Sequence, residues 1–199
     1  MITVSDAAKL CALSYTGAVN DWDEWLEVDG VAAGIKYVDG NTVIAFRGSQ
    51  SEDDWLRDFD EIPTDHPTLG HVHSGFLKGM AAFFSACRPL IKGDLCICGH
   101  SLGGSHACIM AGLSAQRVAR LVLFGCPRPG FAKLREVVSG NCDQIDTFRN
   151  RADPVPIVPY LLGLYRWVKD PMEVYSTTAP KLPSGDHSIL LYIEATQGM

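Results

Sequence analysis

The segment Gly99-His100-Ser101-Leu102-Gly103-Gly104 constrains the fold of this chain more than any other. It follows an apolar run, Leu95 to Cys98, that predicts a strand, and it precedes Gly104 to Leu113, which has helical character. The segment therefore matches the pattern G-x-S-x-G between a strand and a helix, where small residues flanking the serine let the two elements approach closely. A second apolar run, Arg120 to Phe124, completes a strand, helix, strand pattern, which predicts a right-handed crossover and a parallel sheet of the α/β class.

A serine at such a turn is a candidate nucleophile, and it needs a base and an acid later in the chain. A hydroxyl group attacks a carbonyl only when a base removes its proton, and the base in turn needs a carboxylate to fix its tautomer. Asp153 follows a predicted strand, Gln144 to Arg149, and His187 precedes a predicted closing helix, Ser188 to Ala195. We therefore predict Ser101 as nucleophile, Asp153 as acid and His187 as base, although a plain glycine-rich turn would match the same short pattern. Other aspartates also follow the serine, namely Asp143, Asp146, Asp170 and Asp186.

Two backbone amides are candidates for stabilising a negatively charged oxygen. A helix that begins just after Ser101 directs its first amides toward the place where charge develops on an attacked carbonyl, which makes the Leu102 amide one donor. Ser49 follows the predicted strand Asn41 to Phe46 in an Arg47-Gly48-Ser49 turn, and it is the second candidate. A simple turn that ends a strand would explain the same residues.

Composition limits the class of protein. The 199 residues suit one domain, residues 1–199, and the formal charge of -6 argues against binding to a nucleic-acid backbone. The chain shows neither an apolar stretch long enough to span a bilayer nor a leader-like start, so we expect a cytoplasmic protein, with release by a non-classical route or host lysis left open. Its 7 cysteines lie mostly among small apolar residues, which predicts buried free thiols. The sequence does not determine the oligomeric state.

Two helices, a hairpin and one more strand are predicted from local patterns. The spacing of apolar residues predicts one helix over Ser5 to Tyr15 and another over Gly75 to Cys87. Val31 to Val38 and Asn41 to Phe46 are separated by Asp39-Gly40, which predicts an antiparallel hairpin. Glu173 to Thr177 predicts a further strand.

The chain resembles the class 3, or fungal-type, lipases of the α/β-hydrolase superfamily. The resemblance covers four segments in order: residues 43–49 with Trp55 and Asp58, residues 71–76, the segment 99–104, and Asp153-Pro154-Val155-Pro156. It implies a compact α/β-hydrolase fold, a mostly parallel sheet flanked by helices, and hydrolysis of small-molecule or lipid esters without metal or other cofactor. It also implies Ser101, Asp153 and His187 as the triad, with Ser49 and Leu102 at the oxyanion hole.

The segment after Ser49 corresponds to the lid of that family. It is strongly acidic, and Trp55, Leu56 and Phe59 are spaced to form an apolar face. Because its carboxylates would oppose an anionic surface, we expect small or dispersed esters rather than strongly interfacial action, with transient contact to a lipid interface left open. Trp55 in the core and a solvated acidic face would explain the same residues.

A second apolar segment begins just beyond Asp153. Val155 and Ile157 start a run, extending to Trp167, that could line an acyl pocket, contact lipid, or simply cover the core. We include Val155 and Ile157 among the candidate substrate-binding residues.

Other functions fit parts of the sequence. Cys96, Cys98, His100, His106 and Cys108 are residue types that bind zinc, but their spacing matches no standard site, and we predict no metal. A phospholipase, a thioesterase or an acyltransferase would use the same triad. A non-catalytic binding module built on the same fold is a further alternative, and the presence of Ser101, Asp153 and His187 argues against it.

Overall fold

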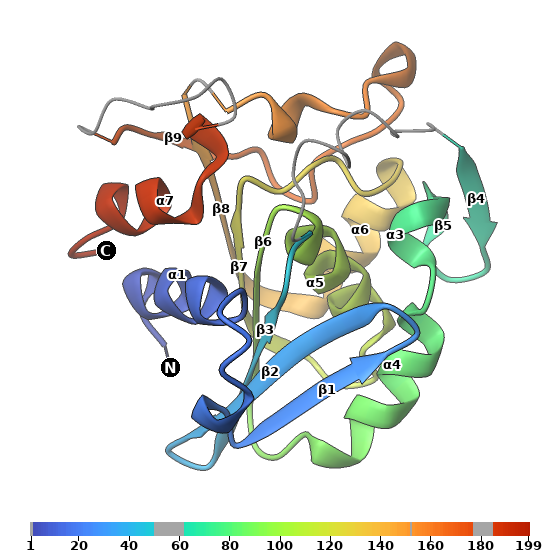
Figure 1. The fold of residues 1–199 in the computed structure, drawn as a ribbon. Helices are drawn as coiled ribbons and strands as arrows, with labels where there is room; N and C mark the ends of the chain where they lie inside the picture. The colour runs from blue at the N-terminus through green and yellow to red at the C-terminus, as the bar shows by residue number, and fades with distance from the viewer. Residues whose placement is uncertain (1, 50–61, 152, 177–184) are drawn as a thin grey trace.

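A mixed sheet of seven strands forms the centre of the molecule, in the order β1-β2-β3-β6-β7-β8-β9 (Figure 1). The computed structural model describes residues 2–49, 62–151, 153–176 and 185–199. The strands of this sheet are β1 (Glu24–Val28), β2 (Val31–Val38), β3 (Asn41–Phe46), β6 (Leu95–His100), β7 (Val118–Phe124), β8 (Cys142–Asn150) and β9 (Met172–Val174). A separate pair, β4 (Pro63–His66) and β5 (Gly70–His73), forms a small antiparallel hairpin.

The antiparallel part of the sheet confirms the predicted hairpin and adds a strand to it. β2 and β3 have the bounds expected from the sequence, and Asp39 and Gly40 both have positive φ, 51° and 79°. That conformation matches the twist of the strands and favours the Asp-Gly pair. β1, which the sequence analysis did not predict, pairs with β2 at the sheet edge.

The parallel part of the sheet places the strand ends that carry the candidate residues at one edge. β3 pairs with β6, β6 with β7, β7 with β8 and β8 with β9, all parallel. In this register Phe46 lies opposite Gly99, and His100 lies opposite Phe124. The chain therefore leaves β3, β6 and β7 on the same side of the molecule, where ligands bind in open α/β sheets.

Helices cover both faces of the sheet, as the figure shows (Figure 1). α3 (Ser74–Leu77), α4 (Met80–Cys87), α5 (Leu102–Leu113) and α6 (Ala132–Asn141) lie on one side, and α1 (Val4–Leu13) and α7 (Ile189–Ala195) on the other. The side chains of β6 point alternately to the two faces of the sheet. Leu95 and Ile97 belong to the core on the α5 side, which we call the first core, and Cys96 and Cys98 belong to the second core, on the α1 side. The second core also contains residues of α1 and α7, which lie at the two ends of the chain. In the described parts of the chain, short 3-10 helices span Val19–Asp21, Arg88–Leu90, Val155–Ile157, Leu161–Gly163 and Gly185–His187.

One predicted helix is divided in two. The pattern over Gly75 to Cys87 predicted a single helix, whereas α3 ends at Leu77 and α4 begins at Met80. Gly79 between them has φ 77°, and a Cβ there would lie 2.5 Å from the carbonyl oxygen of Asp29. The close approach of the β1–β2 turn therefore breaks the helix at a residue that only glycine fills without strain.

The helices at the two ends of the chain begin at hydrogen-bonded caps. Thr3 and Asp6 form a capping box at the start of α1, and the Ser188 side chain accepts from the Leu190 amide at the start of α7.

All seven cysteines are buried and free, as predicted. Within the described ranges, no helix is long and apolar enough to cross a membrane.

Candidate active site

Ser101 lies at a sharp turn between the end of β6 and the start of α5. Its φ of 57° and ψ of -131° place a residue with a side chain in a backbone region that costs about 1–3 kcal/mol. The turn is held from both sides, because the Ser101 amide donates to the carbonyl of Phe124 at 3.0 Å and the Gly104 amide donates to the carbonyl of Ser101 at 2.9 Å. The strand and helix thus fix a strained serine at the carboxyl edge of the sheet.

The glycines around Ser101 are required by backbone contact. A Cβ on Gly99 would overlap the carbonyl of Gly103, and a Cβ on Gly103 would overlap the carbonyl of Phe46 at the end of β3. Neither backbone can move without breaking the sheet or α5. The sequence argument for small residues on both sides of the serine is therefore confirmed by the packing.

Asp153 and His187 come together in the interior, although 33 residues separate them in the sequence. His187 Nδ1 lies 2.7 Å from Asp153 Oδ2, and the two side chains are almost completely buried. The other carboxylate oxygen, Asp153 Oδ1, accepts from the Val155 amide at 2.9 Å. The carboxylate is therefore positioned by its own loop, and it fixes the orientation of the imidazole.

The predicted nucleophile and the predicted base each have one buried polar atom that is available for chemistry. Ser101 Oγ and His187 Nε2 are both inaccessible to solvent, and neither has a hydrogen-bond partner among the described residues. Because Asp153 occupies Nδ1 of the imidazole, Nε2 is the nitrogen that remains for a proton from another group. A buried polar group without a partner is destabilising, so such groups are found mainly where function requires them.

Tyr192 is a further contact of the carboxylate that sequence reasoning missed. Its hydroxyl donates to Asp153 Oδ2 at 2.5 Å and accepts from the Asn150 amide at 2.9 Å. Burial and the negative charge of Asp153 raise the pKa of Tyr192 well above its ordinary value, so the phenol keeps its proton. The sequence placed Tyr192 in the predicted closing helix but gave no signal that its side chain contacts Asp153, which is distant in the chain.

Gly125 is a second missed residue, and it sets how closely the side chains of Asp153 and His187 can approach each other. Its φ is 54°, and a Cβ there would lie 2.9 Å from both Asp153 Oδ2 and His187 Cε1. The residue directly after β7 must therefore be a glycine for the carboxylate and imidazole to meet at this place. The signal available in the sequence was a single glycine after an apolar strand.

His100, the residue before Ser101, holds the backbone of His187. His100 Nε2 lies 2.7 Å from the carbonyl oxygen of His187, and Tyr15 Oη lies 2.8 Å from His100 Nδ1. Because a carbonyl can only accept, Nε2 carries the proton and Nδ1 accepts from the tyrosine. Burial lowers the pKa of His100 well below its ordinary value, and the neighbouring His187 lowers it further, so this imidazole is neutral.

Ser49 and Leu102 line one pocket of about 290 Å³ beside the serine turn. Gly48, between β3 and Ser49, packs so closely on Tyr15 and the His100 carbonyl that a Cβ would overlap the tyrosine hydroxyl. This contact holds the loop after β3 against the end of β6. The pocket is lined by Gly30, Ala32, Arg47, Gly48, Ser49, Leu102 and His106.

The remaining predicted site residues differ in their environments. Trp55, Leu56 and Phe59, the predicted lid face, lie outside the described residues. Val155 is fully buried next to Asp153, and Ile157 is 41% exposed. Val155 thus supports the acid loop, whereas Ile157 faces solvent.

The residue types considered for zinc are separated by the sheet. Cys96 and Cys98 belong to the core on the α1 side, and Cys108 belongs to the core on the α5 side. Within the part of the chain that the structure describes, no group of three or more metal-binding side chains comes together.

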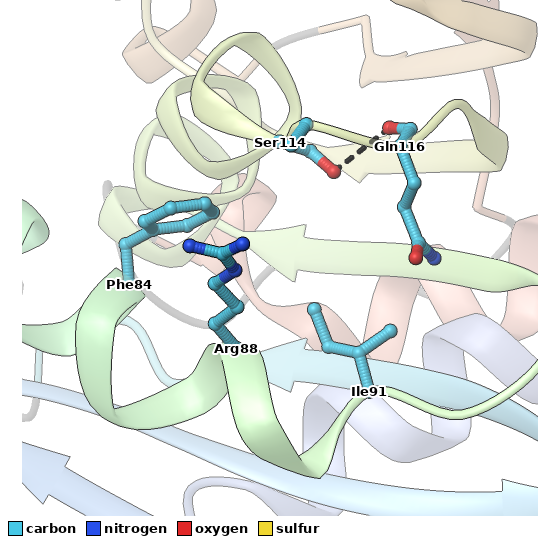
Figure 2. Close-up of a pocket in the computed structure, with 6 residues that line it drawn as sticks. Phe84, Arg88, Ile91, Ser114 and Gln116 are labelled. Carbon is cyan, nitrogen blue, oxygen red and sulfur yellow. Dashed lines mark hydrogen bonds between the residues drawn. The ribbon is translucent and has the colours of Figure 1, made fainter.

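Another pocket, of about 250 Å³, lies at the opposite, amino-terminal end of the strands and lacks this chemistry (Figure 2). Its walls come from the end of α4, the turn after it and the segment after α5. Ser114 Oγ in this pocket donates to the Gln116 carbonyl at 2.8 Å. Its lining residues, Phe84, Arg88, Ile91, Ser114, Ala115 and Gln116, include no histidine or carboxylate.

The fold is that of fungal lipases. A lipase from Rhizopus microsporus var. chinensis superposes with a TM-score of 0.72 at 21% identity, over 89% of this chain and 74% of that one. A Rhizomucor miehei lipase in complex with its propeptide gives a TM-score of 0.69 at 21% identity, over 98% and 81%. A triacylglycerol lipase from Penicillium expansum gives 0.65 at 17%, over 87% and 78%. Comparison with curated protein sequences gives no significant match.

The family is established by sequence. The model of the family "Lipase (class 3)" matches residues 43–163, which is more than half of the chain and includes β3, the serine turn and Asp153. With the seven-stranded sheet and the helices on its two faces, this match confirms the α/β-hydrolase fold predicted from the sequence. The chain belongs to the class 3 lipase family and is a carboxylic ester hydrolase.

Proposed function

We propose that this protein hydrolyses lipid esters through Ser101, His187 and Asp153. The observation that carries the proposal is the 2.7 Å contact between His187 Nδ1 and Asp153 Oδ2. His187 Nε2 and Ser101 Oγ are both buried, and neither has a hydrogen-bond partner among the described residues. A matched solved structure is described as a triacylglycerol lipase whose catalytic centre is a serine protease triad, which supports the same chemistry here.

The reaction begins with attack of Ser101 Oγ on the carbonyl carbon of the ester while His187 Nε2 accepts the hydroxyl proton. The carbonyl oxygen becomes negatively charged, and the amides of Ser49 and Leu102 are the donors that we assign to it. Asp153 stabilises the imidazolium that forms, because its Oδ2 already accepts from Nδ1. The buried position of the carboxylate strengthens this interaction.

Three further proton transfers complete the cycle. The tetrahedral intermediate collapses, the ester C–O bond breaks, and the leaving alcohol takes the proton from His187 Nε2. The acyl group is then held as an ester on Ser101. Water attacks this acyl-enzyme as His187 removes its proton, and the proton returns to Ser101 Oγ as the carboxylic acid is released.

The proposal is tested with a series of p-nitrophenyl esters from acetate to palmitate, in buffer and in mixed micelles. We expect turnover by the wild type and at least a thousandfold less by Ser101→Ala, since loss of the nucleophile leaves only the oxyanion site and binding. Ser114→Ala, on the opposite side of the molecule, is the matched control and should keep full activity. Equal rates for the wild type and Ser101→Ala would overturn the proposal and favour a non-catalytic binding module.

The same preparation separates the candidate substrate classes. Release of fatty acid from triacylglycerol, from phosphatidylcholine and from an acyl thioester is compared at one enzyme concentration. Our expectation from the sequence, that dispersed esters are preferred, requires that hydrolysis does not increase sharply when the substrate passes from monomers to an emulsion. A sharp increase would contradict that expectation and favour an interfacial lipase.

A further inference from the structure

A pocket lined with arginines lies beside the loop that follows the acid. It has a volume of about 540 Å³, and its lining includes Arg128, Arg135, Arg166 and Trp167. The segment that forms one wall runs on from Asp153 and Val155, and Figure 1 shows it in orange on the side of the sheet where the parallel strands end. The segment that supplies this wall therefore lies on the same side of the molecule as the serine turn.

The positive charge of this pocket is not balanced by nearby carboxylates. Asp170, the acidic residue in the lining, pairs with Arg135 at 2.9 Å. Among the described residues, Arg128 and Arg166 have no ion-pair partner. The chain as a whole has a formal charge of -6, so this concentration of positive charge runs against its overall balance. A site of this kind attracts anions.

The Arg128 side chain is held in place rather than free in solvent. Its guanidinium carbon lies 4.4 Å from the centre of the Trp167 ring and 5.7 Å from that of Tyr160. The Trp167 indole in turn donates to the carbonyl of Pro156 at 2.5 Å. Burial lowers the pKa of Arg128, and the positive charge of Arg166 lowers it further, yet an arginine keeps its charge at neutral pH. An anion bound here would relieve the repulsion between the two arginines.

Exposed apolar side chains surround the pocket. Leu162 is 89% exposed at the tip of the loop, and Tyr160 and Leu164 on either side of it are 62% and 48% exposed. The backbone of Leu162 has φ 51°, which raises the energy of a leucine at this position, so solvent exposure and strain coincide there. Apolar groups of this kind next to arginines are the composition of surfaces that bind at a lipid interface.

We propose that residues 157–166, with Arg128, form a docking surface for anionic lipid membranes. Leu162 and Leu164 would enter the interface while Arg128 and Arg166 contact lipid phosphate groups. This proposal rests on the proposed function, because docking on this side would bring the serine turn toward the ester groups of the membrane. The acidic sequence of residues 51–61 led us to expect little affinity for anionic surfaces. The proposed docking surface predicts the opposite, because its arginines attract anionic lipids.

The test measures binding separately from catalysis. Sedimentation with vesicles of diether phosphatidylcholine, with or without diether phosphatidylglycerol, gives the fraction bound, and diether lipids contain no acyl ester to hydrolyse. We expect at least tenfold tighter binding to the anionic vesicles and loss of that preference in high salt. Each sample is also assayed on a soluble p-nitrophenyl ester, so failure to bind and failure to hydrolyse are observed independently.

Two variants and two matched controls locate the surface. Arg166→Gln should weaken binding to anionic vesicles about fivefold, the effect of one arginine near a charged surface. Leu162→Asn should weaken binding to both vesicle types about tenfold, and asparagine tolerates the positive φ. The controls are Arg88→Gln, at the opposite end of the strands, and Leu190→Asn, 66% exposed on α7, and neither should change binding.

Three results would overturn the proposal. One is equal binding to neutral and anionic vesicles, and another is wild-type vesicle binding by both Arg166→Gln and Leu162→Asn. The third is binding of soluble glycerol phosphate by the wild type, measured by calorimetry, without any binding to vesicles. That last result would mean that the arginines form a site for a small anion instead.

Discussion

Tyr192 and His187 share one oxygen of Asp153: the phenol donates to Oδ2 at 2.5 Å, and the imidazole nitrogen Nδ1 lies 2.7 Å from the same atom. Tyr192 lies on α7, which follows His187 directly in the chain, so one short segment supplies both groups. The second hydrogen bond restricts rotation of the carboxylate about its Cβ–Cγ bond. The position of the imidazole therefore depends on Tyr192 as well as on Asp153.

Replacing Tyr192 with phenylalanine should lower both turnover and stability. Without the phenol, Asp153 is less restrained, and the buried Asn150 amide loses its acceptor, which costs about 1–3 kcal/mol in unfolding free energy. We expect kcat on a soluble ester to fall severalfold with KM nearly unchanged, because Tyr192 is fully buried and does not line the pocket of Ser49 and Leu102. The control is Tyr175→Phe, a 60% exposed tyrosine that should retain wild-type kcat and stability. A Tyr192→Phe variant with full kcat would show that Oδ2 of Asp153 needs no donor besides His187.

Replacing His100 should affect catalysis according to whether the new side chain can still donate. His100 Nε2 donates to the His187 carbonyl, and the amide nitrogen of glutamine reaches a similar position. His100→Leu should lower kcat by about tenfold to a hundredfold, because small displacements of a catalytic group have effects of that size. His100→Gln should recover most of the loss. Kinetics and thermal melts of both variants distinguish this role from simple packing, which would predict that leucine is the better tolerated of the two.

Ser101 allows the strain of the turn to be measured. Glycine relieves a φ of 57° and ψ of -131°, whereas alanine keeps the strain, and both remove the nucleophile. We expect Ser101→Gly to be more stable than Ser101→Ala by about 1 kcal/mol, after allowing for the greater entropy of glycine in the unfolded chain. Urea unfolding of the two inactive variants gives the difference directly. If Ser101→Ala is the more stable, the turn is not strained.

Much of the sheet could be predicted because its signals are local. The Asp39-Gly40 turn, the apolar runs of β6 and β7 and the glycines around Ser101 each determine structure within a few residues. Asp153 and His187 were chosen as candidates from chain order and from their neighbours, and the structure places their side chains in contact. Their mutual contact, in contrast, is a property of the folded chain.

The features that were missed depend on contacts between distant segments. The break at Gly79 is caused by the backbone of Asp29, and the roles of Tyr192 and Gly125 arise only where α7 and the end of β7 meet Asp153. α6 is a different case, because Leu134 and Val138 are spaced as on one face of a helix and could have indicated it. The unpredicted part of the candidate site is thus the set of groups that surround Asp153 and His187, rather than these two residues themselves.

His106 should make the stability of the protein depend on pH. It lies in α5 next to the pocket of Ser49 and Leu102, and burial lowers its pKa to about 4, against an ordinary value of about 6.5 in the unfolded chain. Between these two values the unfolded histidine binds a proton that the folded one does not. The contribution of His106 to the free energy of unfolding is therefore most favourable above pH 6.5, and it becomes less favourable as the pH is lowered toward 4.

The size of this effect can be isolated with His106→Met, which fills a buried site with a flexible apolar side chain and does not titrate. From the two pKa values, the histidine destabilises the wild type by about 2 kcal/mol more at pH 5 than at pH 7.5. Urea unfolding of both proteins at the two pH values gives this difference, because the contributions of His100 and of the carboxylates are common to both and cancel. Identical pH dependence in the two proteins would mean that His106 is protonated as readily in the folded chain as in the unfolded one.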